Sequence, residues 1–229
     1  MNPTDISPET PRVSVSPRLR VAFYGGSFDP VHHGHLKIAQ KLTELFELDE
    51  FVFIPAFHAP HKKDKKPTSA FHRYAMLSLV TNDLKKIKVS KMELDLPEKP
   101  YTIETLSKLK AELIDHQIFF VMGADSWQEI TTWREWEKVL TIVNIIVVTR
   151  PPIEIGFSHL TPEIQTEIVD LRGKIEFELE AEEKIYLTDA VSLDVSASEI
   201  RKAIRAGSSD WHLEVPHEAA KYIEKYKIY

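Results

Sequence analysis

The chain has 229 residues, of which 43% are hydrophobic, and 29 basic against 35 acidic side chains give a formal net charge of −6. This length suits one large α/β domain with a substantial core, and the acidic balance argues against broad nucleic-acid binding. The lack of cysteine excludes disulfides, thiolate metal sites and a cysteine nucleophile, and no apolar run is long enough to predict a membrane span. We therefore expect a cytoplasmic protein with neither a nucleic-acid nor a membrane partner.

Residues 1–18 contain four prolines and several hydroxyl residues but no apolar segment typical of a secretion signal. We expect them to form a disordered N-terminal tail. Residues 19–229 are then expected to form a single domain that includes a helical C-terminal region.

The first predicted strand covers residues 19–24, which are mostly apolar and β-branched or aromatic. We expect it to end at Gly25 and Gly26, whose bare backbone would let a ligand approach closely. A helix is expected to start at or near His35 and to run to Phe46, where apolar residues recur at helical spacing.

A phosphate site is predicted where this strand meets this helix. The free N–H groups and the positive dipole end of a helix start attract anions, and His32 and His35 add donors whose charge changes near neutral pH. A single histidine near a helix start usually caps the helix or is solvated. Two of them in H-x-G-H after a Gly-Gly turn favour a functional site.

The stretch GGSFDPVHHGH at residues 25–35 resembles the G-G-[ST]-F-D-P-x-H-x-G-H signature of the nucleotidyltransferase superfamily. It is most similar to that of the bacterial nicotinate mononucleotide adenylyltransferases. The resemblance implies a doubly wound, Rossmann-like and mainly parallel sheet with helices on both faces. It also implies transfer of AMP from ATP to nicotinate mononucleotide in NAD synthesis, with Mg²⁺ held by the substrate phosphates. The ATP-binding residues that it implies in this stretch are Gly25, Gly26, Ser27, Phe28, His32 and His35, with Ser27 also near nicotinate mononucleotide.

A second strand is predicted at residues 51–55, and a proline-punctuated, lysine-rich loop leaves its carboxyl end, where α/β sheets place ligands. Most of these lysines are expected to be solvated. The pair His61-Lys62 resembles the P-P-H-[KR] element of the family, which implies that Lys62 contacts nicotinate mononucleotide. The next helix, residues 70–83, should bury its apolar residues and present Arg73 to the loop before it.

After a strand at residues 87–89, the alternation in residues 92–96 predicts an extended segment. A helix then runs to Leu113 with Thr102 as its expected N-cap. The Tyr101-Thr102 pair resembles the [SY]-Y-T element of the family, which implies that Thr102 and the helix start contact the pyridine carboxylate. Capping alone explains Thr102 equally well.

The apolar run at residues 118–122 predicts a central strand that ends at Gly123 and Asp125. These two residues resemble the G-x-D motif of the family, in which the aspartate lies near the ATP ribose or supports Mg²⁺. The Thr132-Trp133 pair, before a short helix at residues 135–140, resembles the T-W pair of the family. It implies that Trp133 stacks on the nicotinate ring, although tryptophan is normally a core residue.

A further strand at residues 144–148 ends near Arg150, which we expect to contact phosphate or adenosine. Proline at the first helical position predicts a helix from Thr161, with Ile164, Ile168 and Leu171 as its apolar stripe. A last strand is expected at residues 184–188.

Residues 194–201, DVSASEIR, resemble the I-S-[SA]-[ST]-x-I-R motif of the family. This implies that Ser196, Ser198 and the helix start bind ATP phosphates, while Arg201 neutralises the leaving pyrophosphate. The residues alone predict Ser198 as the N-cap of a helix that runs to Ala206 and is stopped by Gly207. A structural helix follows Pro216.

His32, His35 and Arg201 are thus the candidate catalytic residues, acting by charge and hydrogen bonding, and no protein metal ligand is predicted. Nicotinamide mononucleotide and phosphopantetheine are alternative acceptors for the same ATP site. A nucleotide-binding sensor without turnover is an alternative of another class. The sequence leaves the oligomeric state open.

Overall fold

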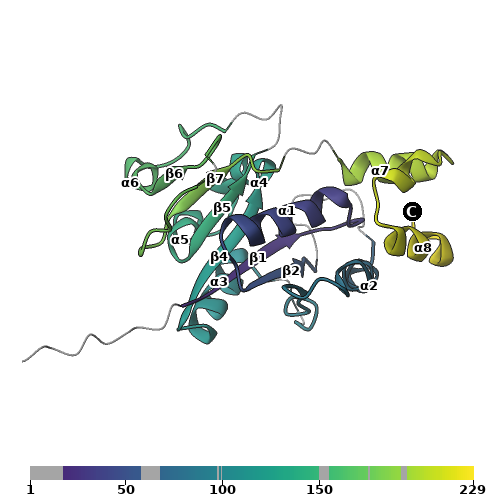
Figure 1. Cartoon of the computed structure of the whole chain (residues 1–229), viewed down its shortest axis with the longest axis horizontal. Helices are drawn as coiled ribbons and strands as arrows, with labels where there is room; N and C mark the ends of the chain where they lie inside the picture. Colours follow the sequence, from purple (N-terminus) through teal and green to yellow (C-terminus); the bar gives the residue numbers. More distant parts are fainter. Residues whose placement is uncertain are drawn as a thin grey trace, which may run out of the picture.

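The computed structural model describes residues 18–57, 68–96, 98, 100–149, 155–174, 176–191 and 195–229. Its centre is a parallel sheet of seven strands in the order β3-β2-β1-β4-β5-β7-β6 (Figure 1). The strands are β1 (Leu19–Gly26), β2 (Glu50–Pro55), β3 (Ile87–Val89), β4 (His116–Gly123), β5 (Asn144–Val148), β6 (Ile168–Asp170) and β7 (Ile185–Thr188).

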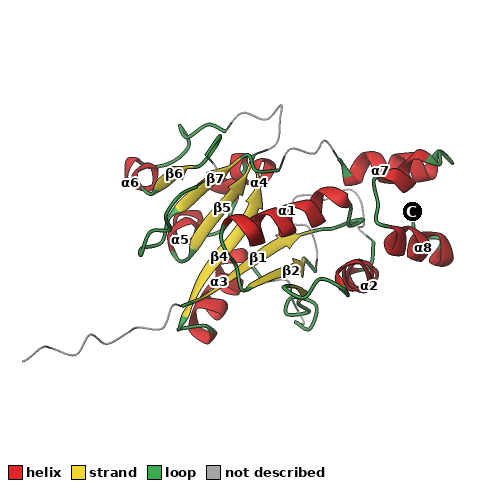
Figure 2. Cartoon of the chain, in the orientation of Figure 1, coloured by secondary structure: helices red, strands yellow, loops and turns green. Residues whose placement is uncertain are grey.

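Helices connect the strands and flank the sheet (Figure 2). The α-helices are α1 (His33–Leu45), α2 (Ala70–Thr81), α3 (Thr102–Glu112), α4 (Ala124–Gln128), α5 (Trp136–Thr141), α6 (Pro162–Thr166), α7 (Ala197–Arg205) and α8 (His217–Tyr226), with 3₁₀ turns η1 (Ile130–Thr132) and η2 (Asp210–Leu213). This arrangement confirms the expected doubly wound, Rossmann-like architecture.

Alternation along the strands sends side chains to two separate cores, one on each face of the sheet. On one face, Ala22 and Phe119 pack with residues of α1 and α2. On the other, Phe23 and Phe120 pack with residues of α3 and α5. Both faces of the central strands are therefore buried, as their nearly continuous apolar runs predict.

The C-terminal helices share the first of these cores. Ile200 of α7, Trp211 of η2 and Ile223 of α8 belong to the same buried cluster as Ala22 and Phe119. α8 also contacts α2. The helical C-terminal region is therefore packed against the sheet domain through continuous hydrophobic contacts.

β1 ends at the glycines as expected, and Gly25 and Gly26 still pair with Ile54 and Pro55 of β2. One expectation near a strand end is wrong. Residues 92–96 form a turn rather than an extended segment, in which the N–H of Leu94 bonds the carbonyl of Lys91 and the Leu94 side chain is buried. One buried leucine, and not strand pairing, accounts for the apolar position there.

The helix predicted from Thr161 is also only partly correct. Thr161 caps α6, but the helix ends at Thr166, and Ile168 begins the edge strand β6 beside β7. Pairing with β7 outweighs the weak helical stripe, since β-branched residues suit a strand. The helix at residues 70–83 was expected to bury its apolar residues, but Phe71 near its start is exposed.

The sheet order places a topological switch between β1 and β4. From β1 the chain winds through β2 and β3 to one side, whereas β4 and β5 lie on the other. Ligands of open α/β sheets bind at such a point, outside the carboxyl ends of the strands. Both predicted phosphate motifs lead into helices, α1 and α7, and α1 follows directly from the end of β1.

Candidate active site

A cavity of about 170 Å³ opens at this switch point. Its walls come from the ends of β1, β4 and β5 and from the start of α1 and the approach to α7. The lining residues are Tyr24, His32, Gly34, His35, Ile38, Gly123, Ala124, Asp125, Val148, Thr149, Val191 and Val195. The structure thus brings His32, His35, Gly123 and Asp125 to one cavity although they are far apart in the sequence.

The two histidines form the start of α1. The helix begins at His33 rather than at His35, and His32 is its N-cap. The backbone N–H of His32 donates to Nδ1 of His35 at 3.2 Å, and the two rings stack with centroids 3.7 Å apart. Because Nδ1 accepts this bond, the proton of the neutral His35 ring is assigned to Nε2, which is then a donor.

Burial and the neighbouring His32 lower the pKa of His35 well below its ordinary value of 6.5. Desolvation disfavours the charged ring, and two imidazolium groups in contact would repel each other. His35 is therefore neutral at pH 7 in the free protein. An anion held at the helix start would oppose both effects and favour the protonated ring.

This pKa shift predicts a pH dependence of stability. Below pH 6.5 the unfolded chain binds a proton that folded His35 does not, so the free energy of unfolding falls as the pH is lowered. The expected slope is about 1.4 kcal/mol per pH unit until the folded-state pKa is reached. Urea denaturation between pH 5 and 8 measures it, and His35→Asn should give a shallower slope below pH 6.5. An unchanged slope in that variant would assign the effect to another group.

Packing leaves little room for a side chain at two glycines of the GGSFDPVHHGH stretch. A Cβ on Gly26 would lie 2.8 Å from the ring of Phe28, and one on Gly34 would lie 3.0 Å from Nδ1 of His32. Phe28 is itself buried, and its ring meets the His35 ring edge-on at 4.9 Å. Phe28 is predicted to bind ATP, and in the structure its buried ring packs against the ring of His35.

The second motif forms the start of α7, with a different cap from the expected one. Ser196, not Ser198, occupies the N-cap position, so Ser198 lies in the first turn. The guanidinium of Arg201 donates to Oγ of Ser198 at 3.1 Å and to the backbone carbonyl of Asp29. Gly207, with a φ of 71°, follows the end of the helix as predicted.

The starts of α1 and α7 lie next to each other. Val195, directly before the N-cap of α7, lines the cavity together with His32 and His35, and a Cβ on Gly34 would be 3.8 Å from Cβ of Val195. Arg201 bonds the loop that leads into α1. Two helix N-termini therefore meet at one cavity, an arrangement that suits a polyphosphate.

The residues predicted to face the acceptor lie on a different pair of elements. Thr102 is the first residue of α3, and Tyr101, not Thr102, is its N-cap. Trp133 follows η1, and its buried Nε1 has no hydrogen-bond partner among the described residues. Arg134 joins the two, since its guanidinium lies 4.7 Å from the centroid of the Tyr101 ring. Neither Thr102 nor Trp133 lines the cavity of the histidines.

Two candidate residues, Lys62 and Arg150, lie outside the described residues, as does His61. In the ranges that the structure covers, no group of three or more histidine, aspartate or glutamate side chains is placed to hold a metal ion. Over the same ranges, no helix is long and apolar enough to cross a bilayer. The predicted tail at residues 1–18 is described only at Arg18.

Arg73 is a major support of the site. It is 1% exposed, and it donates to the carbonyls of Ser27 and Ala56, each at 2.5 Å, and of Thr68 at 3.0 Å. Its side chain therefore joins the loop after β1 to the loop after β2. The sequence predicted that Arg73 would face the loop before its helix, and the structure confirms this, but the bond to Ser27 was not foreseen.

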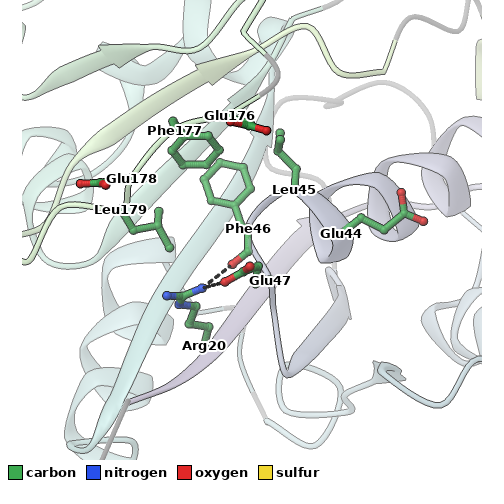
Figure 3. Close-up of a pocket in the computed structure, with 9 residues that line it drawn as sticks. All are labelled: Arg20, Glu44, Leu45, Phe46, Glu47, Glu176, Phe177, Glu178 and Leu179. Atoms are coloured by element: carbon green, nitrogen blue, oxygen red, sulfur yellow. Dashed lines mark hydrogen bonds and ion pairs between the residues drawn. The ribbon is translucent and has the colours of Figure 1, made fainter. Parts of the chain in front are cut away.

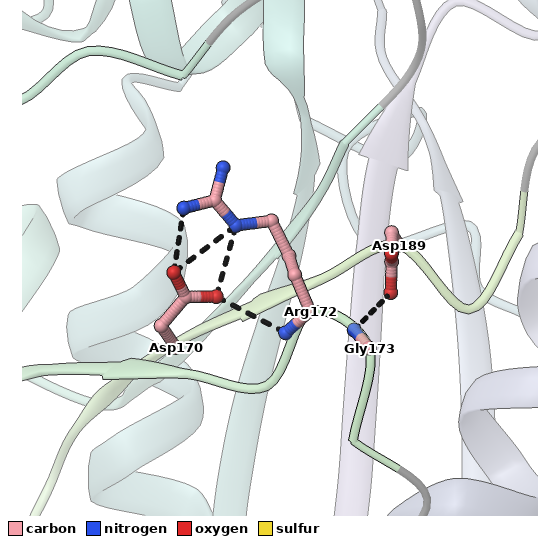
Figure 4. A network of polar contacts seen from close by, with 4 residues as sticks. All are labelled: Asp170, Arg172, Gly173 and Asp189. Carbon is pink, nitrogen blue, oxygen red and sulfur yellow. Dashed lines mark hydrogen bonds and ion pairs between the residues drawn. The ribbon is translucent and has the colours of Figure 1, made fainter.

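Replacement of Arg73 by methionine should strongly destabilise the fold. It leaves buried carbonyls without donors, at about 1 to 3 kcal/mol for each unsatisfied group, so we expect a loss of about 3 kcal/mol or more in the free energy of unfolding. Urea denaturation measures this. The matched control is Arg172→Met, which breaks an exposed ion pair with Asp170 (Figure 4) and should cost about 1 kcal/mol or less. Equal losses in the two variants would contradict the role of Arg73.

A second cavity, of about 560 Å³, lies away from these motifs (Figure 3). It is lined near the beginning of β1 by Arg20 and near the end of α1 by Phe46, which packs on Phe177 with ring centroids 5.1 Å apart. The histidine cavity lies instead where β1 ends. The larger cavity contains none of the predicted site residues.

The parallel sheet, its switch-point cavity and the two helix starts define a nucleotidyltransferase of the Rossmann-like class. Residues 23–203 match the cytidylyltransferase-like family. The chain is 35% identical over 218 residues to a "probable nicotinate-nucleotide adenylyltransferase" of Citrifermentans bemidjiense, covering 92% of this chain and 98% of the relative. It is 33% identical over 205 residues to a protein of the same description from Corynebacterium jeikeium, covering 90% and 98%. The chain belongs to the nicotinate-nucleotide adenylyltransferase family.

Solved structures support the same fold. The nicotinic acid mononucleotide adenylyltransferase of Plasmodium falciparum, complexed with NaAD, superposes with a TM-score of 0.71. The alignment covers 92% of this chain and 97% of that one at 23% identity. At this identity the likeness concerns the fold alone.

Proposed function

We propose that this protein transfers AMP from ATP to nicotinate mononucleotide, releasing pyrophosphate and forming nicotinate adenine dinucleotide for NAD synthesis. Membership of the nicotinate-nucleotide adenylyltransferase family identifies this activity. The observation that carries the site assignment is the meeting of the α1 and α7 helix starts at one cavity that His32 and His35 line. The loop that contains Ser27, between β1 and α1, and the start of α7 are proposed to hold the ATP phosphates between them.

In the proposed reaction the phosphate oxygen of nicotinate mononucleotide attacks the α-phosphorus of ATP, and the bond to the bridging oxygen of pyrophosphate breaks. No covalent enzyme intermediate is required, so the protein acts by positioning and by stabilising charge. The Nε2–H of His35 is the donor available to a phosphate oxygen. The stacked His32 ring holds His35 in this orientation.

Arg201 is proposed to neutralise the leaving pyrophosphate together with Ser196 and Ser198. Among the residues that the structure describes, two of its N–H groups are used, on Asp29 and Ser198. A guanidinium has five N–H donors, so three remain for phosphate oxygens. Gly123 and Asp125 are proposed to face the ribose of ATP, and Arg150 its phosphate or adenosine. Gly25 and Gly26, at the end of β1, are proposed to present bare backbone to ATP.

The acceptor is proposed to bind between the start of α3 and the turn that carries Trp133. The first turn of α3 offers backbone N–H groups and the positive end of its dipole to the pyridine carboxylate, and Thr102 lies in that turn. The Trp133 ring is proposed to stack on the pyridine, and Lys62 to contact the mononucleotide. The contact of Arg134 with Tyr101 keeps these two elements together.

Mg²⁺ is proposed to arrive bound to the substrate phosphates, which Asp125 can approach from the cavity wall. When bound, the ion offsets negative charge on the phosphates, and its reluctance to lose water suits a site with few protein ligands. We further propose that residues 19–229 work as one domain, that the protein acts in the cytoplasm, and that it binds no nucleic acid.

The test of acceptor choice is pyrophosphate release from ATP and Mg²⁺ with a panel of acceptors. We expect nicotinate mononucleotide to give the highest kcat/KM. The panel includes nicotinamide mononucleotide, which replaces the carboxylate with a neutral amide, and phosphopantetheine. Equal or better turnover of nicotinamide mononucleotide would overturn the assignment of the α3 start to the carboxylate.

A further inference from the structure

The carboxylate of Asp29, in the loop between β1 and α1, is the centre of a buried hydrogen-bond network. Asp29 is 7% exposed. Its Oδ1 accepts from the hydroxyl of Tyr229 at 2.6 Å, and its Oδ2 accepts from the N–H of Thr68 at 3.3 Å. Its backbone carbonyl accepts from Arg201. Three separate parts of the chain therefore hold this one residue.

Tyr229 reaches Asp29 by an unusual path from the end of α8. Lys227, the C-cap of α8, has a φ of 49°, and Tyr229 has a φ of 80°. Residues other than glycine rarely adopt a backbone conformation with positive φ. Such a conformation persists where surrounding contacts determine it. Burial and the nearby Asp29 carboxylate raise the pKa of Tyr229 well above its ordinary value, so its hydroxyl remains a donor at neutral pH.

Asp29 lies between the two halves of the phosphate site. It precedes His32, the N-cap of α1, by three residues, and the bond from Arg201 ties it to α7. A displacement of the Asp29 loop therefore moves both the histidine pair and the arginine. On the other side of the loop, Arg73 holds the carbonyl of Ser27 but makes no hydrogen bond to the Asp29 carboxylate among the contacts described.

We propose that Tyr229 is a positioning residue for adenylyl transfer, which acts through Asp29 to hold the starts of α1 and α7 in register around the ATP phosphates. This role rests on the proposed function. Tyr229 itself is proposed to touch no substrate. Its hydroxyl fixes the loop, and the loop fixes the orientation of His35 and Arg201 toward the charge that develops during transfer.

The test is Tyr229→Phe, which removes the hydroxyl and keeps the ring. We expect kcat to fall by about tenfold, the effect of losing one charge-assisted hydrogen bond of about 1.4 kcal/mol, because misplaced donors stabilise the transition state less well. KM for ATP and for nicotinate mononucleotide should change by less than about twofold. Asp29→Asn, which weakens the same bond from the other side, should give the same split between kcat and KM.

The matched control is Tyr222→Phe. Tyr222 lies on α8, and its hydroxyl bonds Nδ1 of His72 at 3.0 Å, away from the Asp29 loop. A general loss of C-terminal packing would affect both tyrosine variants alike, whereas the positioning role predicts near-unchanged kcat in Tyr222→Phe. Combining Tyr229→Phe with Asp29→Asn should lower kcat no further than the more severe single change, since both act in one network.

Wild-type kcat in Tyr229→Phe, or an equal fall in Tyr222→Phe, would overturn the proposal. Additive effects of the Tyr229 and Asp29 changes would also overturn it. These outcomes differ from failure of the proposed function, in which the unaltered protein itself would form no nicotinate adenine dinucleotide.

Discussion

Replacement of His35 by alanine should lower kcat by about 10²-fold or more, the usual effect of removing a donor that stabilises a transition state. The Nε2–H of the neutral ring is the donor that the structure makes available, because Nδ1 already accepts the N–H of His32. Steady-state pyrophosphate release with saturating ATP, Mg²⁺ and nicotinate mononucleotide measures the loss.

Alanine also removes the acceptor for the N–H of His32, so a second variant separates the two roles. In His35→Asn the side-chain oxygen can take the place of Nδ1, but the Nε2 donor is lost. We expect the same large fall in kcat with a smaller loss of stability. The control is His33→Ala, since His33 is exposed on the same helix and should leave kcat nearly unchanged. A near-wild-type rate in His35→Asn would remove the Nε2 donor from the mechanism.

Replacement of Arg201 by glutamine should lower kcat by about 10²-fold as well. The change removes the positive charge proposed to neutralise the leaving pyrophosphate, and it also weakens the tie between α7 and the carbonyl of Asp29. Because a lysine supplies charge without the planar fork, Arg201→Lys should recover only part of the rate. The same pyrophosphate assay measures both variants.

Arg205 provides the matched control for this charge. It lies on α7 in the last turn and is exposed, so Arg205→Gln changes the net charge of the helix equally while leaving the site intact. We expect it to change kcat by less than about twofold. Equal losses in the two glutamine variants would show that the general charge of α7, and not the position of Arg201, sets the rate.

The fold was largely predictable because its signals are local. Six of the seven strands lie where a strand was predicted, mostly in apolar runs bounded by glycine, proline or polar residues, and helical spacing of apolar residues indicates α1. The short edge strand β6 was missed, since a strand of three residues gains its stability from pairing with β7 rather than from its own pattern. The N-caps of α3 and α7 were predicted at Thr102 and Ser198 but lie at Tyr101 and Ser196, for a similar reason. A hydroxyl near a helix start marks the region but does not fix which residue precedes the first turn.

The sequence motifs of the candidate site could be predicted, but the buried hydrogen bonds that hold its loops could not. The H-x-G-H stretch and the serine-arginine motif predict two helix starts as candidate phosphate sites, and the structure brings those two helix starts to one cavity. No sequence pattern indicates that Tyr229 bonds Asp29 across 200 positions, or that a buried Arg73 is held by carbonyls. Such contacts depend on tertiary packing. The signal that marks Arg73 beforehand is its place near the start of the predicted helix at residues 70–83, facing the loop before it.

Product analysis decides whether the protein transfers AMP directly from ATP to nicotinate mononucleotide. The protein is incubated with ATP, Mg²⁺ and nicotinate mononucleotide, and the products are identified by mass spectrometry. We predict nicotinate adenine dinucleotide and pyrophosphate in equal amounts, with no adenylyl group on the protein. Pyrophosphate release without the dinucleotide, or a protein carrying covalent AMP, would rule out direct transfer to nicotinate mononucleotide.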